Sequence, residues 1–360
     1  MSSQTILPRP GATVRLVIAL ALITAVGSAC EWDYDTLKME QQRFPNALEL
    51  ISGKFLRHGQ EFYQWRIQDR KSRLTADPTD LKLYDDLAVA YDKTGQQSLA
   101  IETILKKDAL QPGEYETYAN LGTFHIHAGN LAAGVEHLKR AIEINPAAHF
   151  GREIYQQLLV EYVLSKQVDG VTPLPLVGDK FAPYTSSFAE FVFKARKTPD
   201  TPEARTTETE AALKGILGMM RFGNYRSPIL LEAAGDLLRA DWNKDAKRLA
   251  ARAYLKASQE TADQPAVSAA YLKMAKSSLS MQTVAAQTSN QLPFKTLAAS
   301  FSKELKEAAA WYAKVRANEL KWIKFGVQVD EAFDKEYYTN GQVNLDTNQN
   351  ELKPKDTGQV

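Results

Sequence analysis

Residues 81–114 read LKLYDDLAVAYDKTGQQSLAIETILKKDALQPGE, and residues 115–148 read YETYANLGTFHIHAGNLAAGVEHLKRAIEINPAA. The two stretches align without a gap, so the second repeats the first at an offset of 34 positions. Two copies in register indicate a repeat protein. The recurring positions are Tyr84, Leu87, Tyr91, Gly95, Ala100, Ile104 and Pro112, which return as Tyr118, Leu121, His125, Gly129, Gly134, Leu138 and Pro146.

Each copy predicts two helices joined by a short turn. Tyr84, Leu87 and Tyr91 are spaced so that their side chains fall on one stripe of a first helix. Gly95 follows this stripe, where the residue after the last turn often needs a positive φ. Pro112 lies past the second helix and ends it without removing an internal hydrogen bond. No segment carries a convincing strand pattern, so the predicted fold class is all-α.

Small residues recur where the two helices of a hairpin have to approach closely. Ala88 and Gly122 hold this place on the first helices, and Ala100 and Gly134 hold it on the second helices. The pattern resembles the tetratricopeptide repeat, whose consensus is close to the residues AIEINP at 141–146. The resemblance implies hairpins that stack on one another, because one unit cannot bury its apolar face alone. It also implies a concave groove that binds another polypeptide.

The resemblance assigns the groove residues one by one, because this family lines its groove from fixed positions of the repeat. The first repeat contributes Lys82, Asp85, Asp86, Val89, Asp92 and Lys93. The second contributes Glu116, Ala119, Asn120, Thr123, Ile126 and His127. Asp85 and Val89 replace the lysine and asparagine with which co-chaperone members grip a terminal carboxylate. We therefore expect a basic or polar partner segment, and expect Asp85→Lys with Asp86→Lys to alter binding without loss of helicity.

The chain begins with the features of an export signal. Arg9 and Arg15 precede the apolar run LVIALALITAV at residues 16–26, which is shorter than the about 20 residues that span a bilayer. Residues 1–29 are therefore predicted to be a signal peptide. Cys30, the only cysteine, stands where a lipoprotein signal peptidase leaves it N-terminal. We expect lipid on Cys30 to anchor the chain at the outer membrane or elsewhere in the periplasm.

Ordinary secretion stays open as the alternative, because Gly27 and Ala29 also form a small-x-small cleavage site. The mature protein is then soluble in the periplasm or secreted. With a single cysteine, the chain has no intramolecular disulfide.

The chain is predicted to hold two helical units. Residues 30–44 form a short lead, residues 45–167 form the solenoid, and residues 200–338 form a second helical domain with weak repeats. Residues 168–199 are a linker with one short helix from Ser187 to Lys197, opened by the capping pair Ser187 and Glu190. Residues 339–360 are predicted to be disordered.

Further boundaries follow from local signals. A helix from Asn46 to His58 and a helix from Glu61 to Thr75 predict a degenerate first repeat. Thr207 and Glu210 predict a capped helix start, and Ser227 with Pro228 predicts another. The remaining predicted helices are Arg152 to Ser165, Pro265 to Met281, and a long stretch from Pro293 to Tyr338 that is interrupted near Gly326.

The sequence contains no recognised catalytic or phosphate-binding motif. His125 and His127 point about 200° apart on a helix, so no metal site is predicted. Asp85 and Asp86 predict a solvated polar face and not an acid–base pair. The aromatic side chains predicted to pack in the core are Phe188, Phe191, Phe193, Trp311, Tyr312, Trp322 and Phe325.

Together these features predict a non-catalytic scaffold or assembly factor that binds a protein or peptide and needs no cofactor. The 44 basic and 43 acidic residues give a net charge of +1 without a basic stripe, which argues against a nucleic-acid partner. One alternative is a helical enzyme or ligand-binding domain in residues 200–338, fused to the repeats. Another is a homo-oligomer that stacks through its own groove.

Overall fold

The computed structural model describes Asp33 and residues 44–178, 187–241, 244–280 and 293–338. The predicted signal peptide, Cys30 and the predicted disordered tail lie outside these residues. Within them, the fold is all-α and resembles a solenoid of helical hairpins, with an isolated Val168–Val171 bridge and no strand.

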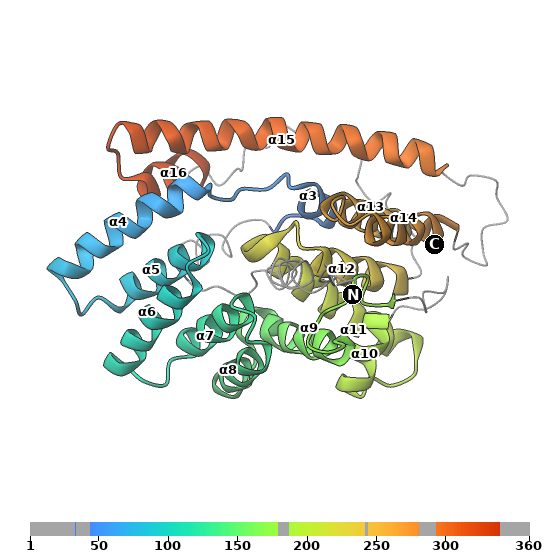
Figure 1. Ribbon diagram of the computed structural model, residues 1–360, viewed down its shortest axis with the longest axis horizontal. Helices are drawn as coiled ribbons and strands as arrows, with labels where there is room; N and C mark the ends of the chain where they lie inside the picture. Colours follow the sequence, from blue (N-terminus) through green and yellow to red (C-terminus); the bar gives the residue numbers. More distant parts are fainter. Residues whose placement is uncertain (1–32, 34–43, 179–186, 242–243, 281–292, 339–360) are drawn as a thin grey trace, which may run out of the picture.

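Hairpins follow one another in a curved row (Figure 1). The row begins with a single helix, α4 (Gln60–Ala76). The helices that form its hairpins are α5 (Leu81–Lys93) with α6 (Gln97–Leu110), α7 (Tyr115–His127) with α8 (Leu131–Ile144), α9 (Arg152–Lys166) with α11 (Pro202–Met219), and α12 (Pro228–Ala240) with α13 (Lys244–Glu260). A 3-10 turn, η1 (Ala148–Gly151), precedes α9, and α14 (Pro265–Ser280) packs on α13.

The two repeats end their first helices in the same way. The amide of Gln96 donates to the Tyr91 carbonyl oxygen at 2.8 Å, and the amide of Asn130 donates to the His125 carbonyl oxygen at 2.8 Å, one repeat later. Gly95 and Gly129 adopt φ values of +79° and +83° between these partners. Both ends are therefore glycine caps of the predicted kind, in which the chain reverses through a left-handed residue.

Close approach between α7 and α8 depends on Gly122 and Gly134. A Cβ atom on Gly134 would lie 2.9 Å from the Gly122 carbonyl oxygen and 2.5 Å from a side-chain carbon of Ile126. The predicted small-residue contact between these two helices is confirmed. Gly215 and Gly218 have the same role on α11, where an added Cβ would meet side-chain atoms of α9 at 2.8 Å.

The predicted degenerate first repeat is wrong. The helix expected from Asn46 to His58 ends early, as α3 (Ala47–Ser52), because the chain turns at Gly53 with a φ of +82°. Asn46 caps α3 and forms a capping box with Glu49. Instead of pairing with α4, α3 packs against α13 and α15 (Phe294–Lys324).

The core crosses the boundary predicted at residues 168–199. One cluster of buried side chains contains Leu138 and Leu159 from the first predicted unit and Ile216 and Tyr271 from the second. The segment between them is an insertion within the α9–α11 hairpin, and it carries α10 (Ser187–Arg196), which packs on α9, α11 and α12. The described residues therefore build one continuous stack.

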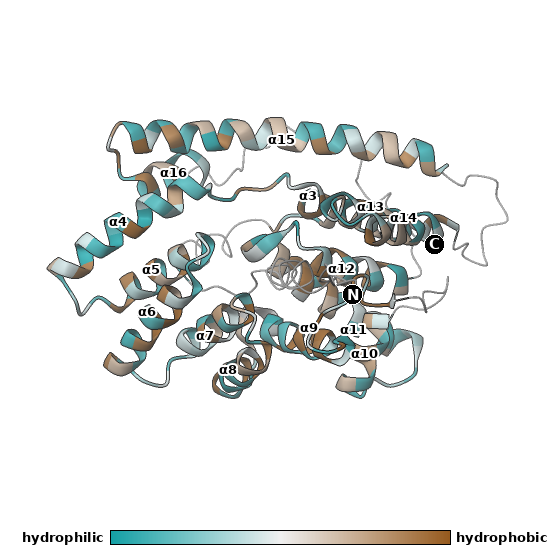
Figure 2. Cartoon of the chain, viewed as in Figure 1, coloured by the Kyte–Doolittle hydropathy of each residue, from teal (hydrophilic) through white to brown (hydrophobic). Residues whose placement is uncertain are grey.

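Two helix starts show where local capping signals succeeded and failed. Ser227 caps α12 as predicted, with Pro228 in the first turn. The helix expected to begin at Thr207 begins five residues earlier, at Pro202, because Thr201 accepts from the amide of Ala204. This helix continues into a π-helical turn, η3 (Met220–Asn224). The apolar and polar bands along the helices are visible in Figure 2.

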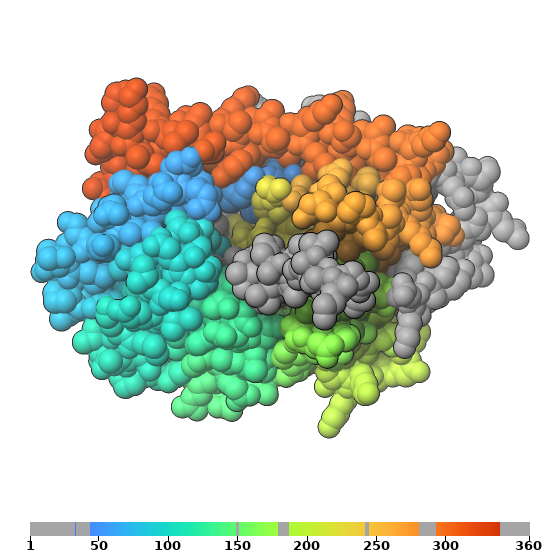
Figure 3. Space-filling model, viewed as in Figure 1, coloured from blue at the N-terminus to red at the C-terminus, as the bar shows by residue number. Residues whose placement is uncertain are grey.

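The long helix α15 spans the curved row from one end to the other (Figure 3). Its first half packs near α13, where Arg252 donates twice to the Glu304 carboxylate at 2.8 Å. Its last turns contact α4 and α16 (Val329–Tyr337). The predicted interruption falls at Gly326, which adopts a φ of +66° between α15 and α16.

Candidate functional site on the inner face

First helices of successive hairpins form the inner face of the curved row. Here α5 contacts both α4 and α7. The predicted groove positions on α5 and α7 meet one another across this face, because residues about one repeat apart lie opposite each other. Asn120 donates to Asp85 at 3.2 Å, and the Nδ1 atom of His127 lies 2.7 Å from Oδ2 of Asp92.

The pattern continues to α9. The amide of the Gln156 side chain donates to the Thr123 hydroxyl at 3.2 Å. The three contacts join residues that are 35, 35 and 33 positions apart. We call this set of contacts the inner ladder, consisting of Asp85–Asn120, Asp92–His127 and Thr123–Gln156.

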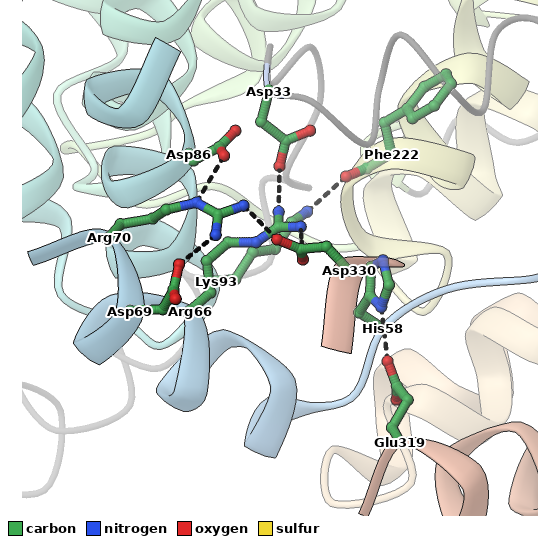
Figure 4. A network of polar contacts seen from close by, with 10 residues as sticks. All are labelled: Asp33, His58, Arg66, Asp69, Arg70, Asp86, Lys93, Phe222, Glu319 and Asp330. Atoms are coloured by element: carbon green, nitrogen blue, oxygen red, sulfur yellow. Dashed lines mark hydrogen bonds and ion pairs between the residues drawn. The ribbon is translucent and has the colours of Figure 1, made fainter. Parts of the chain in front are cut away.

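Most predicted groove residues are buried, which corrects the expectation of a solvated polar face. Asp85 and Asp86 are only 6% and 4% exposed. The other buried predicted positions are Val89, Asp92, Ala119, Asn120, Thr123, Ile126 and His127. Lys82 is exposed, and Lys93 and Glu116 are partly exposed. The Lys93 ammonium group donates to the Phe222 carbonyl oxygen (Figure 4), so Lys82 and Glu116 are the part of the predicted groove that a partner can reach directly.

Asp85 is neutralised from within its own hairpin. The Lys107 ammonium on α6 lies 2.6 Å from Oδ2 of Asp85, and both side chains are buried. Burial raises the pKa of Asp85 to about 7, and Lys107 opposes this rise only in part. The prediction of a basic partner relied on an uncompensated acidic repeat, so it loses that support.

Two arginines on α4 hold four carboxylates at one end of the inner face (Figure 4). Arg70 donates from Nε to Asp86 at 2.8 Å and also contacts Asp69 and Asp330. Arg66 donates to Asp330 at 2.7 Å and to Asp33 at 3.2 Å. We call this group the arginine cluster, consisting of Arg66, Arg70, Asp33, Asp69, Asp86 and Asp330.

The electrostatic environment of the arginine cluster favours the charged form of Arg70. Arg66 is fully buried and Arg70 is 3% exposed, so each guanidinium group depends on nearby carboxylates to offset its lost hydration. Burial and Arg66 lower the pKa of Arg70, but Asp330 and Asp86 outweigh both and hold it above its ordinary value. Asp86→Lys would therefore place a third cation beside two buried ones, so the burial of this site argues against the unchanged helicity that the sequence predicts for that substitution.

The cluster joins both ends of the described chain to α4. Asp33 comes from the lead that follows Cys30, and Asp330 opens α16. A second contact nearby fixes α15, where Glu319 lies 2.6 Å from Nδ1 of the buried His58 and accepts from the amide of Gly59 at 3.0 Å. The sequence signal for the contacts of Asp330 and Glu319 is weak, because their partners are more than 250 positions away and such a spacing carries no local pattern.

Another buried acidic pair lies in the second half of the chain. Glu232 on α12 accepts from the amides of Leu176 and Val177 at 2.9 and 3.0 Å and from Tyr271 at 2.7 Å. Asp236, one turn later, accepts from the Phe188 amide and from the Tyr254 hydroxyl, both at 2.8 Å. The pair therefore binds the inserted segment and the start of α10 to the core.

These carboxylates test the alternative of an enzyme or ligand-binding domain in residues 200–338. Burial raises the pKa of Glu232 to about 7, with Asp236 adding to the rise, and burial raises the pKa of Asp236 as well. Each acid is occupied by backbone amides and a tyrosine, so the polar groups that converge here already have partners. A pocket of about 360 Å³ lies instead at the surface between α10 and α11, lined by Arg196 and Glu208 among others.

The histidines of α7 have separate neighbours. His125 stacks on His137 of α8 with 5.1 Å between ring centroids, whereas His127 faces Asp92 on α5. Across the described residues, no three His, Cys, Asp or Glu side chains gather as metal ligands do. No described helix is long and apolar enough to span a membrane.

The predicted core aromatics are only partly confirmed. Phe188 and Phe193 are buried and Phe191 is partly buried, as expected. Trp311, Tyr312 and Trp322 are partly buried.

No protein-family model matches the chain, and no curated protein matches its sequence.

Proposed function

We propose that this chain is a non-catalytic scaffold of the tetratricopeptide-repeat type that binds a protein or peptide along its inner face. The observation that carries this proposal is the inner ladder, because it places the first helices of successive hairpins side by side at one-repeat spacing. Stacks of this kind present extended concave surfaces, and recognition of a polypeptide is the use to which such surfaces are suited.

The buried ladder and the accessible rim have different roles in this proposal. Asp85, Asp92 and His127 fix the spacing of the hairpins and are positioning residues. Lys82 and Glu116, which we call the rim, face the partner. Since Lys82 and Glu116 hold the same position in consecutive repeats, they offer opposite charges one repeat apart, which favours a segment with both signs of charge.

A charge swap tests this assignment. Lys82→Glu combined with Glu116→Lys leaves the net charge unchanged and touches only accessible side chains. The matched control is Glu136→Lys with Lys139→Glu, an exposed pair 3.5 Å apart on α8. Affinity capture from intact cells is expected to recover the partner with the parent and the control and to lose it with the rim swap. Full recovery with the rim swap contradicts binding at this face.

Export and anchoring form the second part of the proposal. Arg9, Arg15 and the apolar run at residues 16–26 support export, and the position of Cys30 supports lipid attachment in the periplasm or at the outer membrane. Intact mass of the mature N-terminus measures this directly. A diacylglyceryl addition on Cys30 that disappears in Cys30→Ser is the expected result, and an unmodified Cys30 supports simple secretion instead.

A further inference from the structure

The turn between α15 and α16 exposes large apolar side chains at one corner of the molecule. Phe325 is 68% exposed, and Val327 and Leu320 are 43% and 39% exposed. The sequence predicts Phe325 in the core, but it lies outside because it follows the last residue of α15 and the chain reverses at Gly326. Exposed apolar residues clustered in one short turn indicate a surface that something else covers.

Lysines surround these apolar side chains. Lys321 and Lys324 are exposed on the last turn of α15, and Lys324 Nζ lies 5.9 Å from the Phe325 ring centroid. Lys314 shares their helix face by its spacing of seven and ten residues. In the described part of the chain, no ion pair joins Lys321 or Lys324 to a carboxylate.

Acidic residues near the turn face the interior. Glu319 contacts His58 at 2.6 Å, and Asp330 contacts the two arginines of α4. The next exposed acids, Glu331 and Glu336, follow on α16. Residues 320–328 therefore present two cations, three apolar side chains and no exposed carboxylate.

We propose that the turn from Leu320 to Gln328 docks on an anionic lipid surface. Phe325 and Val327 enter the boundary between headgroups and acyl chains, where aromatic and aliphatic side chains partition favourably. Lys321 and Lys324 reach the headgroup phosphates, each keeping its aliphatic stem beside the apolar side chains. This combination of bulky apolar residues and lysines suits a membrane surface better than a protein core.

The position of the proposed anchor favours a lipid occupant over a protein. Cys30 is three residues from Asp33, so covalent geometry limits their Cα atoms to about 11 Å apart. Asp33 contacts Arg66, and Arg66 contacts Asp330, which is three residues from Val327. The proposed anchor and the turn therefore each lie three residues from a carboxylate that contacts the Arg66 guanidinium group. Lipid on Cys30 brings the bilayer to this end of the molecule.

This inference rests on the anchoring part of the proposed function but is tested without the anchor. The chain of residues 31–360 keeps every described residue and lacks the signal peptide and Cys30. Its sedimentation with vesicles containing phosphatidylglycerol is compared with vesicles of phosphatidylcholine alone. Binding to the anionic vesicles, weakened by salt, is expected.

Three variants locate the binding surface. Phe325→Ala is expected to weaken binding to the vesicles about tenfold, because the substitution removes the ring whose transfer from water into the membrane interface is favourable. Lys321→Ala with Lys324→Ala is expected to weaken it about tenfold or more. Leu110→Ala, which truncates a side chain 54% exposed on α6, is the matched control and is expected to have no effect.

Three outcomes overturn the inference. Equal binding by Phe325→Ala and the parent, or no binding by the parent, removes the lipid surface as the occupant. Dimerisation in light scattering that Phe325→Ala abolishes assigns the turn to a second copy of the chain. None of these outcomes affects partner capture at the inner face, and loss of capture by the rim swap does not affect vesicle binding, so the two proposals fail separately.

Discussion

His127 on α7 lies with its Nδ1 atom 2.7 Å from Oδ2 of Asp92 on α5, and both side chains are buried. The two residues are 35 positions apart, one repeat and one residue. This contact joins the first helices of two consecutive hairpins. The interaction energy of the pair therefore shows how much polar pairing adds to apolar packing in stabilising the stack.

A double-mutant cycle on Asp92→Asn and His127→Gln is expected to give a coupling energy of about 1–3 kcal/mol, because breaking one side leaves a buried polar group without this partner. Urea unfolding of the parent, both single variants and the double variant provides the four free energies. The exposed pair Glu136 and Lys139 is the control and is expected to couple by less than about 0.5 kcal/mol. Similar coupling in both cycles contradicts a special role for the inner ladder.

Gly134→Ala is expected to lower the free energy of unfolding by about 1–2 kcal/mol. Alanine is the better helix former by about 1 kcal/mol, but its Cβ would approach a backbone oxygen at 2.9 Å and Ile126 at 2.5 Å. The steric cost therefore exceeds the propensity gain. Ala132→Ser, on an exposed position of the same helix, is expected to change stability by less than about 0.5 kcal/mol. A stabilised Gly134→Ala protein, measured by chemical denaturation, contradicts close packing of α7 on α8.

Asp330→Ala is expected to loosen α16 and to destabilise the protein by about 3 kcal/mol, because two buried arginines lose a shared carboxylate. Limited trypsin digestion measures the loosening as faster cleavage after Lys335. Glu331→Ala, at the neighbouring exposed position, is expected to digest at the parent rate. Equal rates for both variants show that α16 is held by its apolar contacts alone.

The buried Glu232 predicts a pH dependence of stability with a definite sign. Its pKa rises from an ordinary 4.5 to about 7 on folding, so the folded state retains a proton that the unfolded state has released. Its contribution is therefore fully present below about pH 4.5 and is lost as the pH rises toward 7, at up to about 1.4 kcal/mol per pH unit. Asp236 acts in the same direction.

Glu232→Gln removes this titration. Unfolding midpoints of the variant and the parent, measured from pH 4.5 to 7.5, are expected to converge as the pH rises, since only the parent loses stability from this group. The variant is also less stable at the start of this range, because the side-chain amide has one acceptor oxygen, whereas the two oxygens of Glu232 accept hydrogen bonds from three donors. A constant difference across this range contradicts a raised pKa for Glu232.

Local features of the fold were predictable because their signals lie within one repeat. Gly95 and Gly129 cap helices, Gly122 meets Gly134, and Ser227 opens α12, each from chemistry confined to a few neighbouring positions. The same reasoning misplaced the start of α11, where Thr201 outcompeted the equally plausible Thr207 as a cap.

The candidate site was predictable in position but not in environment. The repeat register placed Asp85 and Asn120 on the inner face, and they lie there. The repeat register does not show whether other side chains of the protein cover that face, and Asp85 and Asn120 are in fact buried. The partners of Arg66 are Asp33 and Asp330, near opposite ends of the described chain, and only the folded chain brings them together.

A stack of hairpins ordinarily bends easily, because each hairpin contacts only its neighbours and small rotations between them add up along the row. Here α15 connects elements from different parts of the row and restrains their relative motion, because it contacts α3, α4 and α13. Glu304 in its first half contacts Arg252 of α13 and Glu319 near its C-terminal end contacts His58, and these two residues are fifteen positions or about 22 Å apart along a straight helix. We therefore expect α15 to resist bending of the row, so that the inner face keeps nearly the same shape before and after a partner binds.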